Sequence, residues 1–165
     1  MGWLAAGYLV HDAPLESVVS LLPGDPHATG ERVSGERVLR LSMLTGPVYG
    51  LAETGGWTVV SDPGLQIVYD QEAGERLSAN RRALAFLLHS VSAVYGFSLY
   101  TDGALTRRAL YVEGAPEETT GAPLSAEQGL PHPSTEDHVL ALIPRVTGIA
   151  WPALVAATYR TFQAG

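Results

Sequence analysis

The feature that most constrains the fold is the apolar stretch from Ala83 to Glu113, which reads ALAFLLHSVSAVYGFSLYTDGALTRRALYVE. At its centre, Asp102-Gly103 separates two apolar-rich runs, and such a turn is the strongest short-range signal for a β-hairpin. The stretch therefore predicts consecutive antiparallel strands at residues 83–92, 95–101 and 104–113. Residues 83–92 are apolar on both faces, which indicates a strand in the interior of a sheet.

A second hairpin is indicated further toward the N-terminus. Gly55-Gly56 lies between two extended segments, residues 48–54 and 57–61, and a two-residue turn of this kind fixes the register of the strands that it joins. We expect Thr54 opposite Trp57, Ala52 opposite Val59, and Leu51 opposite Val60. Two further strands are expected, at residues 3–10 and 38–45.

Helices are predicted from capping residues and apolar periodicity. Pro14 and Glu16 fit the first turn of a helix that ends before Pro23. An imperfect helix is expected within residues 65–79, a further one begins near Ser134, and a last one runs from Trp151 through Phe162. Residues 27–35 are polar and contain several glycines, so we expect a loop there.

Together these elements predict a single α+β domain over residues 1–165. Its centre is one mainly antiparallel sheet of roughly six or seven strands, with the N-terminal and C-terminal helices packed on it. Residues 114–133 form a long segment with several prolines and glycines. A connection of this length within a compact domain is either functional or mobile, so it is the best candidate for a binding loop.

The composition excludes several kinds of chemistry. The chain has no cysteine, which excludes disulfides, thiolate nucleophiles and cysteine-ligated zinc. All ten basic residues are arginine, which excludes a Schiff-base lysine and the lysine of a P-loop. The net charge of −7 disfavours nucleic acid. It indicates either an ordinary soluble surface, which is the simpler interpretation, or attraction to a basic protein partner.

The sequence also gives no sign of membrane insertion or secretion. No apolar run approaches the roughly 18 to 20 residues that cross a bilayer. The N-terminal segment is apolar but lacks a basic region and a clear cleavage site, so we expect a cytoplasmic protein that does not contact membranes.

The titratable residues do not form a recognisable catalytic or metal-binding motif. His132 and His138 lack the one-turn spacing that places two ligands on one helical face. His89 lies in an apolar strand and is interpreted as a core residue. No nucleophile elbow, zinc-protease motif or dinucleotide-binding motif is present. We therefore expect no metal, no cofactor and no catalytic residues.

One group of residues is a candidate binding site. Simple alternation from the Asp102-Gly103 turn places Tyr100, Arg107, Tyr111 and Glu113 on one face of the sheet. Arg107 could pair with Glu113 or hold a carboxylate through two hydrogen bonds, and arginine with tyrosine is typical of protein interfaces. The alternative is a sheet face covered by helices, with these polar groups at its rim.

A resemblance to a known family rests on several short motifs. They are Gly56-Trp57-Thr58-Val59-Val60, Leu77-Ser78, Val91-Ser92-Ala93-Val94, Phe97 and Asp102-Gly103-Ala104-Leu105. Over about residues 56–113 the chain resembles a family of uncharacterised α+β proteins found mostly in actinobacteria. Similar small proteins often occur near bacterial toxin genes, so the resemblance implies an immunity or partner-binding role by association and implies no catalytic residues.

The leading prediction is a non-enzymatic, intracellular protein-binding module, in a narrower form one that neutralises a toxin. Its acidic surface and residues 114–133 would contact the partner. The alternative is a small-ligand-binding protein or enzyme with a pocket at Tyr100, Arg107 and Tyr111. A third possibility is a homo-oligomer joined through an exposed sheet edge or the last helix.

Overall fold

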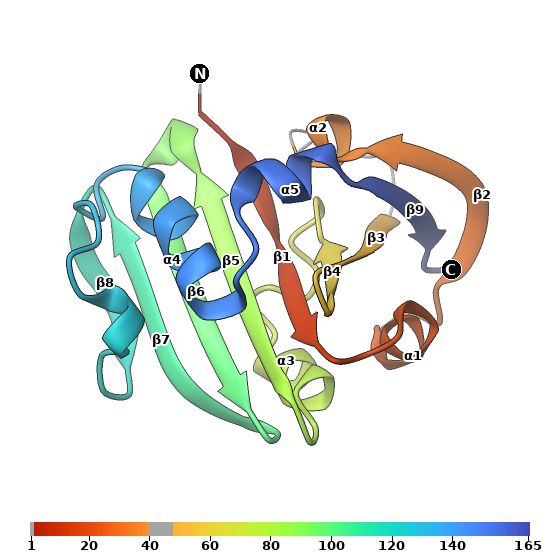
Figure 1. Ribbon diagram of the computed structural model, residues 1–165, viewed down its shortest axis with the longest axis horizontal. Helices are drawn as coiled ribbons and strands as arrows, with labels where there is room; N and C mark the ends of the chain where they lie inside the picture. Colours follow the sequence, from red (N-terminus) through yellow and green to blue (C-terminus); the bar gives the residue numbers. More distant parts are fainter. Residues whose placement is uncertain (1, 40–47) are drawn as a thin grey trace.

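The computed structural model describes residues 2–39 and 48–165, which form one antiparallel sheet with helices on both faces (Figure 1). The sheet has nine strands in the order β2-β9-β3-β4-β1-β5-β6-β7-β8. The strands are β1 (Leu4–His11), β2 (His27–Ser34), β3 (Val48–Thr54), β4 (Trp57–Ser61), β5 (Arg82–His89), β6 (Val94–Thr101), β7 (Ala104–Val112), β8 (Ala115–Thr120) and β9 (Thr158–Gln163). The helices are α1 (Leu15–Leu21), α2 (Gly35–Val38), α3 (Gln71–Leu77), α4 (Asp137–Thr147) and α5 (Trp151–Ala156), with short 3-10 turns η1 (Ser90–Ser92) and η2 (Ser125–Glu127).

Both predicted hairpins are confirmed. Asp102 and Gly103 have φ values of 51° and 82°, and Gly55 and Gly56 have φ values of 56° and 83°. Two consecutive positive φ values match the twist of the flanking strands, and aspartate and glycine adopt them at little cost. The register of the β3–β4 hairpin is the one expected, with Thr54 opposite Trp57. The three central strands β5, β6 and β7 are likewise consecutive and antiparallel.

The α+β class is confirmed, but the sheet is larger than the six or seven strands predicted. Residues 27–35, expected as a loop, contain β2, and the start of the expected loop 114–133 forms β8. Both are edge strands whose side chains are almost all exposed, so no apolar pattern marks them. β8 follows a turn at Glu113-Gly114, where both φ values are positive.

The expected last helix is wrong in its second half. α5 ends at Ala156, and residues 158–163 form β9 between β2 and β3. Tyr159 and Thr161 are buried and alternate along this segment, which is rich in β-branched and aromatic residues and therefore suits a strand with partners on both sides. The strand expected at residues 38–45 is wrong at its first residue, because Val38 belongs to α2. Residues 40–47, which include the rest of that expected strand after position 39, lie outside the described residues.

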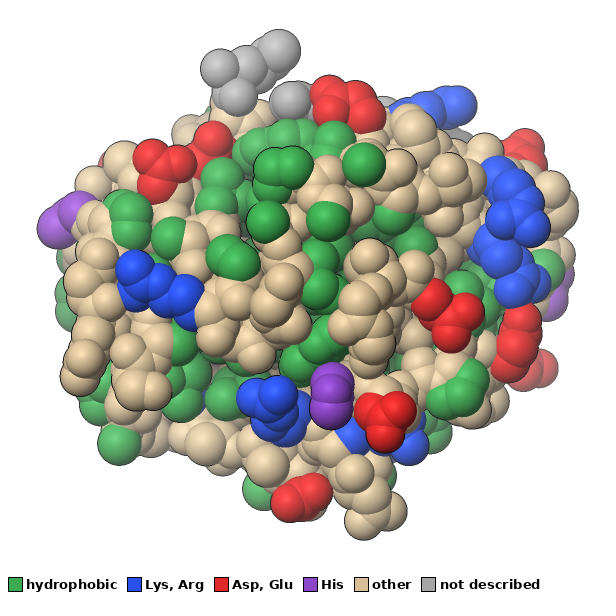
Figure 2. Space-filling view, viewed as in Figure 1, with side chains coloured by type: hydrophobic (Ala, Val, Ile, Leu, Met, Phe, Trp, Pro, Cys, Tyr) green, Lys and Arg blue, Asp and Glu red, His purple; other side chains and the backbone are tan. Residues whose placement is uncertain are grey.

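Helices cover the two faces of the sheet unequally. On one face, which we call the α4 face, Val139 and Leu142 of α4 and Leu154 of α5 pack on the strands. On the opposite face, which we call the α3 face, α1 and α3 contribute Val18 and Leu77 to a second core. The N-terminal and C-terminal helices therefore pack on the sheet as predicted. Figure 2 shows the α4 face, where hydrophobic side chains reach the surface near the centre and charged side chains lie mostly around the rim.

On the α3 face, part of β5 to β8 has no helix over it, although Ala85, Leu87 and Ser98 in this area are buried. α3 lies at the end of these strands near the Asp102-Gly103 turn, where the Gly103 amide donates a hydrogen bond of 3.0 Å to the Ser78 carbonyl. Further along the strands, no helix of the described residues covers this face (Figure 1). This area positions the candidate site.

Candidate functional site

The four residues predicted to share a face are divided by a β-bulge in the β6–β7 hairpin. Tyr100 pairs with Leu105 as the turn requires, but Leu99 then pairs with Arg107, which leaves Thr106 as an extra residue. A bulge adds one residue to one strand, so it inverts the alternation of side chains beyond it. The expected common face is therefore wrong: Tyr100 lies on the α3 face and Arg107 on the α4 face.

Arg107 is a buried structural residue. Its Nε and Nη2 donate hydrogen bonds of 3.0 and 2.9 Å to the two carboxylate oxygens of Glu127, and Nη1 donates to the Gly121 carbonyl at 2.9 Å. Glu127 also accepts a hydrogen bond of 2.6 Å from the Leu124 amide. This bidentate pair fastens residues 121–128 to β7. The partner of Arg107 is thus Glu127 rather than Glu113.

Tyr111 and Glu113 have separate surroundings. The half-buried Tyr111 ring lies edge-on to His138 of α4, with ring centroids 5.2 Å apart. The His138 ring forms a hydrogen bond of 2.9 Å through Nδ1 to the Pro131 carbonyl, so both residues help to hold residues 121–136 on the α4 face. Glu113 is exposed in the β7–β8 turn with a φ of 52°. Tyr100, Arg107 and Tyr111 therefore do not line one pocket.

Tyr100 is completely buried beneath α3. A Cβ atom added at Gly74 would lie 2.2 Å from the Tyr100 ring, so glycine is required for this helix to approach the sheet. Burial raises the pKa of Tyr100 above its usual value, against the lowering effect of nearby Arg108. Burial also raises the pKa of Tyr8, whose hydroxyl donates a hydrogen bond of 3.3 Å to the Ile67 carbonyl. Both phenols stay protonated at neutral pH and cannot act as general bases.

Arg108 connects this buried pair to the surface. Its Nη2 donates a hydrogen bond of 2.9 Å to the Tyr100 hydroxyl, and Nε donates one of 3.1 Å to the Ser98 hydroxyl. Nη1 lies 3.2 Å from Oε1 of Glu118 on the edge strand β8. The sequence did not identify Ser98, Arg108 or Glu118, because the bulge at Thr106 has no local signature and β8 was not recognised.

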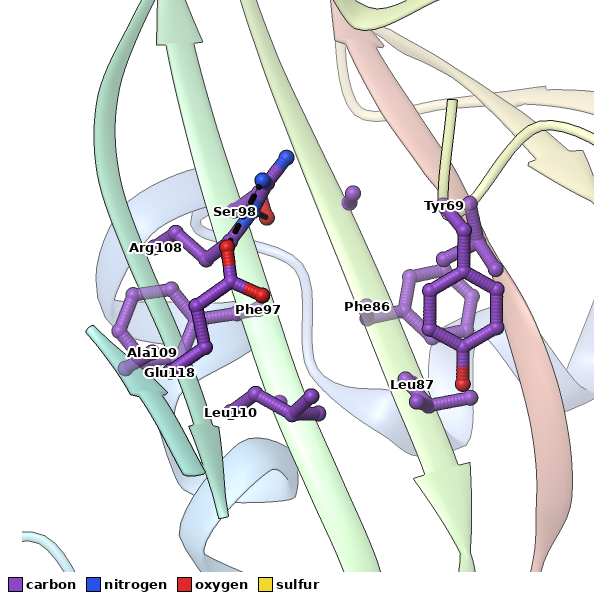
Figure 3. Close-up of a pocket in the computed structure, with 12 residues that line it drawn as sticks. Tyr69, Phe86, Leu87, Phe97, Ser98, Arg108, Ala109, Leu110 and Glu118 are labelled. Atoms are coloured by element: carbon purple, nitrogen blue, oxygen red, sulfur yellow. Dashed lines mark hydrogen bonds and ion pairs between the residues drawn. The ribbon is translucent and has the colours of Figure 1, made fainter. Parts of the chain in front are cut away.

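Beside this network the sheet surface is hollowed. The hollow has a volume of about 90 Å³ (Figure 3). We call its sheet surface the open face, which is formed by Ala85, Leu87, Gly96, Ser98, Arg108 and Leu110. Figure 3 shows Tyr69 on one side of the hollow and Arg108 with Glu118 on the other, with β5 and β6 between them. A Cβ atom at Gly96 would lie 2.9 Å from the Ala109 carbonyl oxygen, so residue 96 carries no side chain that could fill the hollow.

A loop organised by hydrogen bonds to Asp62 holds Tyr69 beside the open face. The buried Asp62 carboxylate accepts hydrogen bonds from the amides of Gln66, Ile67 and Val68, at 2.9, 2.7 and 3.1 Å. Burial raises the pKa of Asp62, and these three hydrogen bonds oppose the rise. The loop leaves Tyr69 61% exposed at the side of the hollow.

Several carboxylates lie in or next to α3 and β8. Glu72 and Glu75 lie on α3, Asp70 precedes that helix, and Glu117 and Glu118 lie on β8. The charges of Asp70 and Glu75 contribute to the raised pKa values of the buried Tyr8 and Tyr100, respectively, so each carboxylate lies near one of these phenols. Of these carboxylates, Glu118 lines the hollow itself, beside Arg108.

Comparisons with known proteins do not assign the chain to a family. No protein-family model matches it, and neither a curated protein nor a solved structure does. The resemblance to the actinobacterial family therefore stays a prediction. Within residues 2–39 and 48–165, no cluster of three or more histidine or acidic residues could hold a metal ion. The same residues contain no helix with the length and apolar character needed to span a bilayer.

Proposed function

We propose that this protein is a protein-binding module that contacts a basic partner through the open face. The observation that carries the proposal is Tyr69, a 61% exposed aromatic residue at a hollow whose floor includes Leu87 and Leu110. Tyrosine and arginine are enriched among the residues that dominate binding energy in protein interfaces. The net charge of −7 and the presence of Glu118 at the hollow favour a partner of positive charge.

The open face fits a protein better than a small molecule. Pockets for small ligands usually measure about 300–1,000 Å³, whereas the hollow measures about 90 Å³. In addition, three nitrogen atoms of Arg108 already have partners within the protein. At this face, a small hollow with internally paired polar groups favours contact with a protein over binding of a small ligand.

The face of the sheet is a better contact surface than its β8 edge. Free edge strands can pair with another chain, and natural proteins block this with proline, charged residues and bulges. β8 carries Pro116, Glu117 and Glu118. The register of its pairing with β7 shifts between Glu118 and Pro116, as in a β-bulge. These features oppose pairing of backbones at this edge and leave the side chains of the open face as the contact.

Toxin neutralisation is the narrower form of the proposal. An acidic module that covers a basic functional surface of a toxin would block access to that surface, as an immunity protein must. This form predicts that co-expression with the partner protects cells from it.

The proposal is tested by isolating the partner and rebuilding the complex. Tagged wild-type protein and tagged Tyr69→Ser would be used to purify partners from lysates of the organism that makes this protein. The retained protein would then be titrated into each purified variant by isothermal calorimetry. Val91→Ser is the matched control, because Val91 is 82% exposed but does not line the hollow. We expect a basic partner whose Kd rises about tenfold with Tyr69→Ser and is unchanged with Val91→Ser. Equal Kd values for all three proteins would contradict the proposal.

A further inference from the structure

The open face has a hollow at its centre, and the shape and charge of this hollow restrict what can enter it. We propose that the hollow receives one basic side chain of the partner, an arginine or a lysine, which lies between Tyr69 and Glu118. This inference rests on the proposed function and specifies the chemistry of the partner.

The two sides of the hollow suit a cation. Tyr69 supplies an exposed aromatic ring on one side, and aromatic faces attract arginine and lysine. On the other side Glu118 contacts Arg108 through Oε1 only, and its side chain is 51% exposed. Within the described residues, no hydrogen bond to its Oε2 is found. This oxygen can accept a hydrogen bond from an incoming guanidinium or ammonium group.

The floor of the hollow suits the aliphatic part of such a side chain. Leu87 and Leu110 lie in the floor together with the small residues Ala85 and Gly96. Arginine and lysine side chains pack their methylene groups on apolar surfaces and keep the charged group at a polar rim. A volume of about 90 Å³ accommodates a side chain rather than a whole metabolite.

The surrounding charges favour a cation over an anion. The charged residues that line the hollow are Glu118 and Arg108. Arg108 already donates hydrogen bonds to Ser98, Tyr100 and Glu118. An anionic group would therefore have to displace Glu118 from Arg108, whereas a cation can be held by the second carboxylate oxygen of Glu118.

A peptide selection tests the inference without knowledge of the natural partner. A phage-displayed library of random dodecapeptides would be selected on immobilised wild-type protein, after depletion on Tyr69→Ser. The enriched peptides should contain an arginine or lysine flanked by apolar residues. In the synthetic consensus peptide, replacement of that residue by glutamine should raise the Kd about tenfold, and Glu118→Gln should raise it by a similar factor.

A charge exchange and a matched control complete the test. Glu118→Arg should bind a peptide in which glutamate replaces the basic residue better than it binds the original peptide. Val91→Ser should bind the original peptide like wild type. Glu118 is half exposed, so its variants should unfold within about 2–4 °C of wild type, which thermal unfolding by circular dichroism would verify.

The possible results separate this inference from the proposed function. Enriched peptides that distinguish wild type from Tyr69→Ser but carry acidic or wholly apolar centres would overturn the inference and leave protein binding by the open face intact. Failure to enrich any peptide that distinguishes the two proteins would also overturn it. The partner isolation and calorimetry described above would then be the test that decides the proposed function.

Discussion

Arg108 donates a hydrogen bond of 2.9 Å from Nη2 to the hydroxyl oxygen of Tyr100. This contact joins the core beneath α3 to the open face, because Tyr100 is completely buried and Arg108 lines the hollow. The guanidinium is fixed by the Ser98 and Glu118 contacts as well, so one side of the hollow is ordered before any partner arrives. An ordered surface loses less conformational entropy on binding, which supports affinity.

Tyr100→Phe should therefore destabilise the protein. It removes the acceptor of a hydrogen bond from a charged donor, and we expect the free energy of unfolding to fall by about 1–3 kcal/mol in urea denaturation. Tyr49→Phe is the matched control. Within the described residues the buried Tyr49 hydroxyl has no hydrogen-bond partner, so its removal should leave stability unchanged or raise it. A larger loss for Tyr49→Phe than for Tyr100→Phe would contradict this interpretation of the network.

Gly74→Ala should also be destabilising, although alanine is the better helix former. The added methyl group would lie 2.2 Å from the Tyr100 ring, so α3 or Tyr100 must move. We expect the free energy of unfolding to fall by about 1–3 kcal/mol, net of the roughly 1 kcal/mol gained in helix propensity. Glu72→Ala, at an exposed position of the same helix, should change it by less than about 0.5 kcal/mol. Chemical denaturation of both variants measures the difference.

The buried Asp62 predicts a specific pH dependence of stability. Because burial raises its pKa in the folded protein above 3.8, the unfolded chain loses this proton first as the pH increases. The free energy of unfolding of wild type, relative to Asp62→Asn, should therefore decrease as the pH rises above 3.8 and level off above the folded pKa. Urea denaturation of both proteins between about pH 3.5 and 7 measures this difference. A difference that stays constant or grows with pH would show that the carboxylate is not destabilised by burial.

Arg107→Ala should affect stability but not partner binding. Breaking a buried ion pair leaves Glu127 without its partner, and we expect a loss of about 3–5 kcal/mol in the free energy of unfolding. Hydrogen–deuterium exchange should rise most in residues 121–128, which the pair holds on β7. Leu124→Ala, in the same segment, separates loss of packing from loss of the charge pair. If Arg107→Ala abolished binding in a sample that is still folded, the contact surface would lie on the α4 face.

The parts of the fold that the sequence predicted are those determined by local chemistry. Asp102-Gly103 and Gly55-Gly56 specify their hairpins because only a few residues adopt positive φ values without strain. The apolar core strands β5 and β6 follow from composition alone. The edge strand β8 could not be recognised, because its side chains are exposed and carry no apolar alternation.

The candidate site was missed for a different reason. The extra residue Thr106 reverses which face each later side chain of β7 points to. Counting from the turn therefore placed Arg107 on the face of Tyr100, where the structure has Arg108. Whether a strand contains a bulge depends on its pairing partner rather than on its own residues. The second half of the last helix failed similarly, since Thr158 and Phe162 fit both a helical stripe and the strand β9, and the partners β2 and β3 decided the outcome.

The most direct measurement is a nuclear magnetic resonance titration of the ¹⁵N-labelled protein with N-acetyl-arginine amide. The account predicts that the largest shifts occur at the amides of Tyr69, Gly96, Leu110 and Glu118, around the hollow. They should be absent with N-acetyl-norleucine amide and in Tyr69→Ser. Shifts centred on Arg107 and Tyr111 of the α4 face, or no shifts around the hollow, would contradict the claim that the open face binds a basic group.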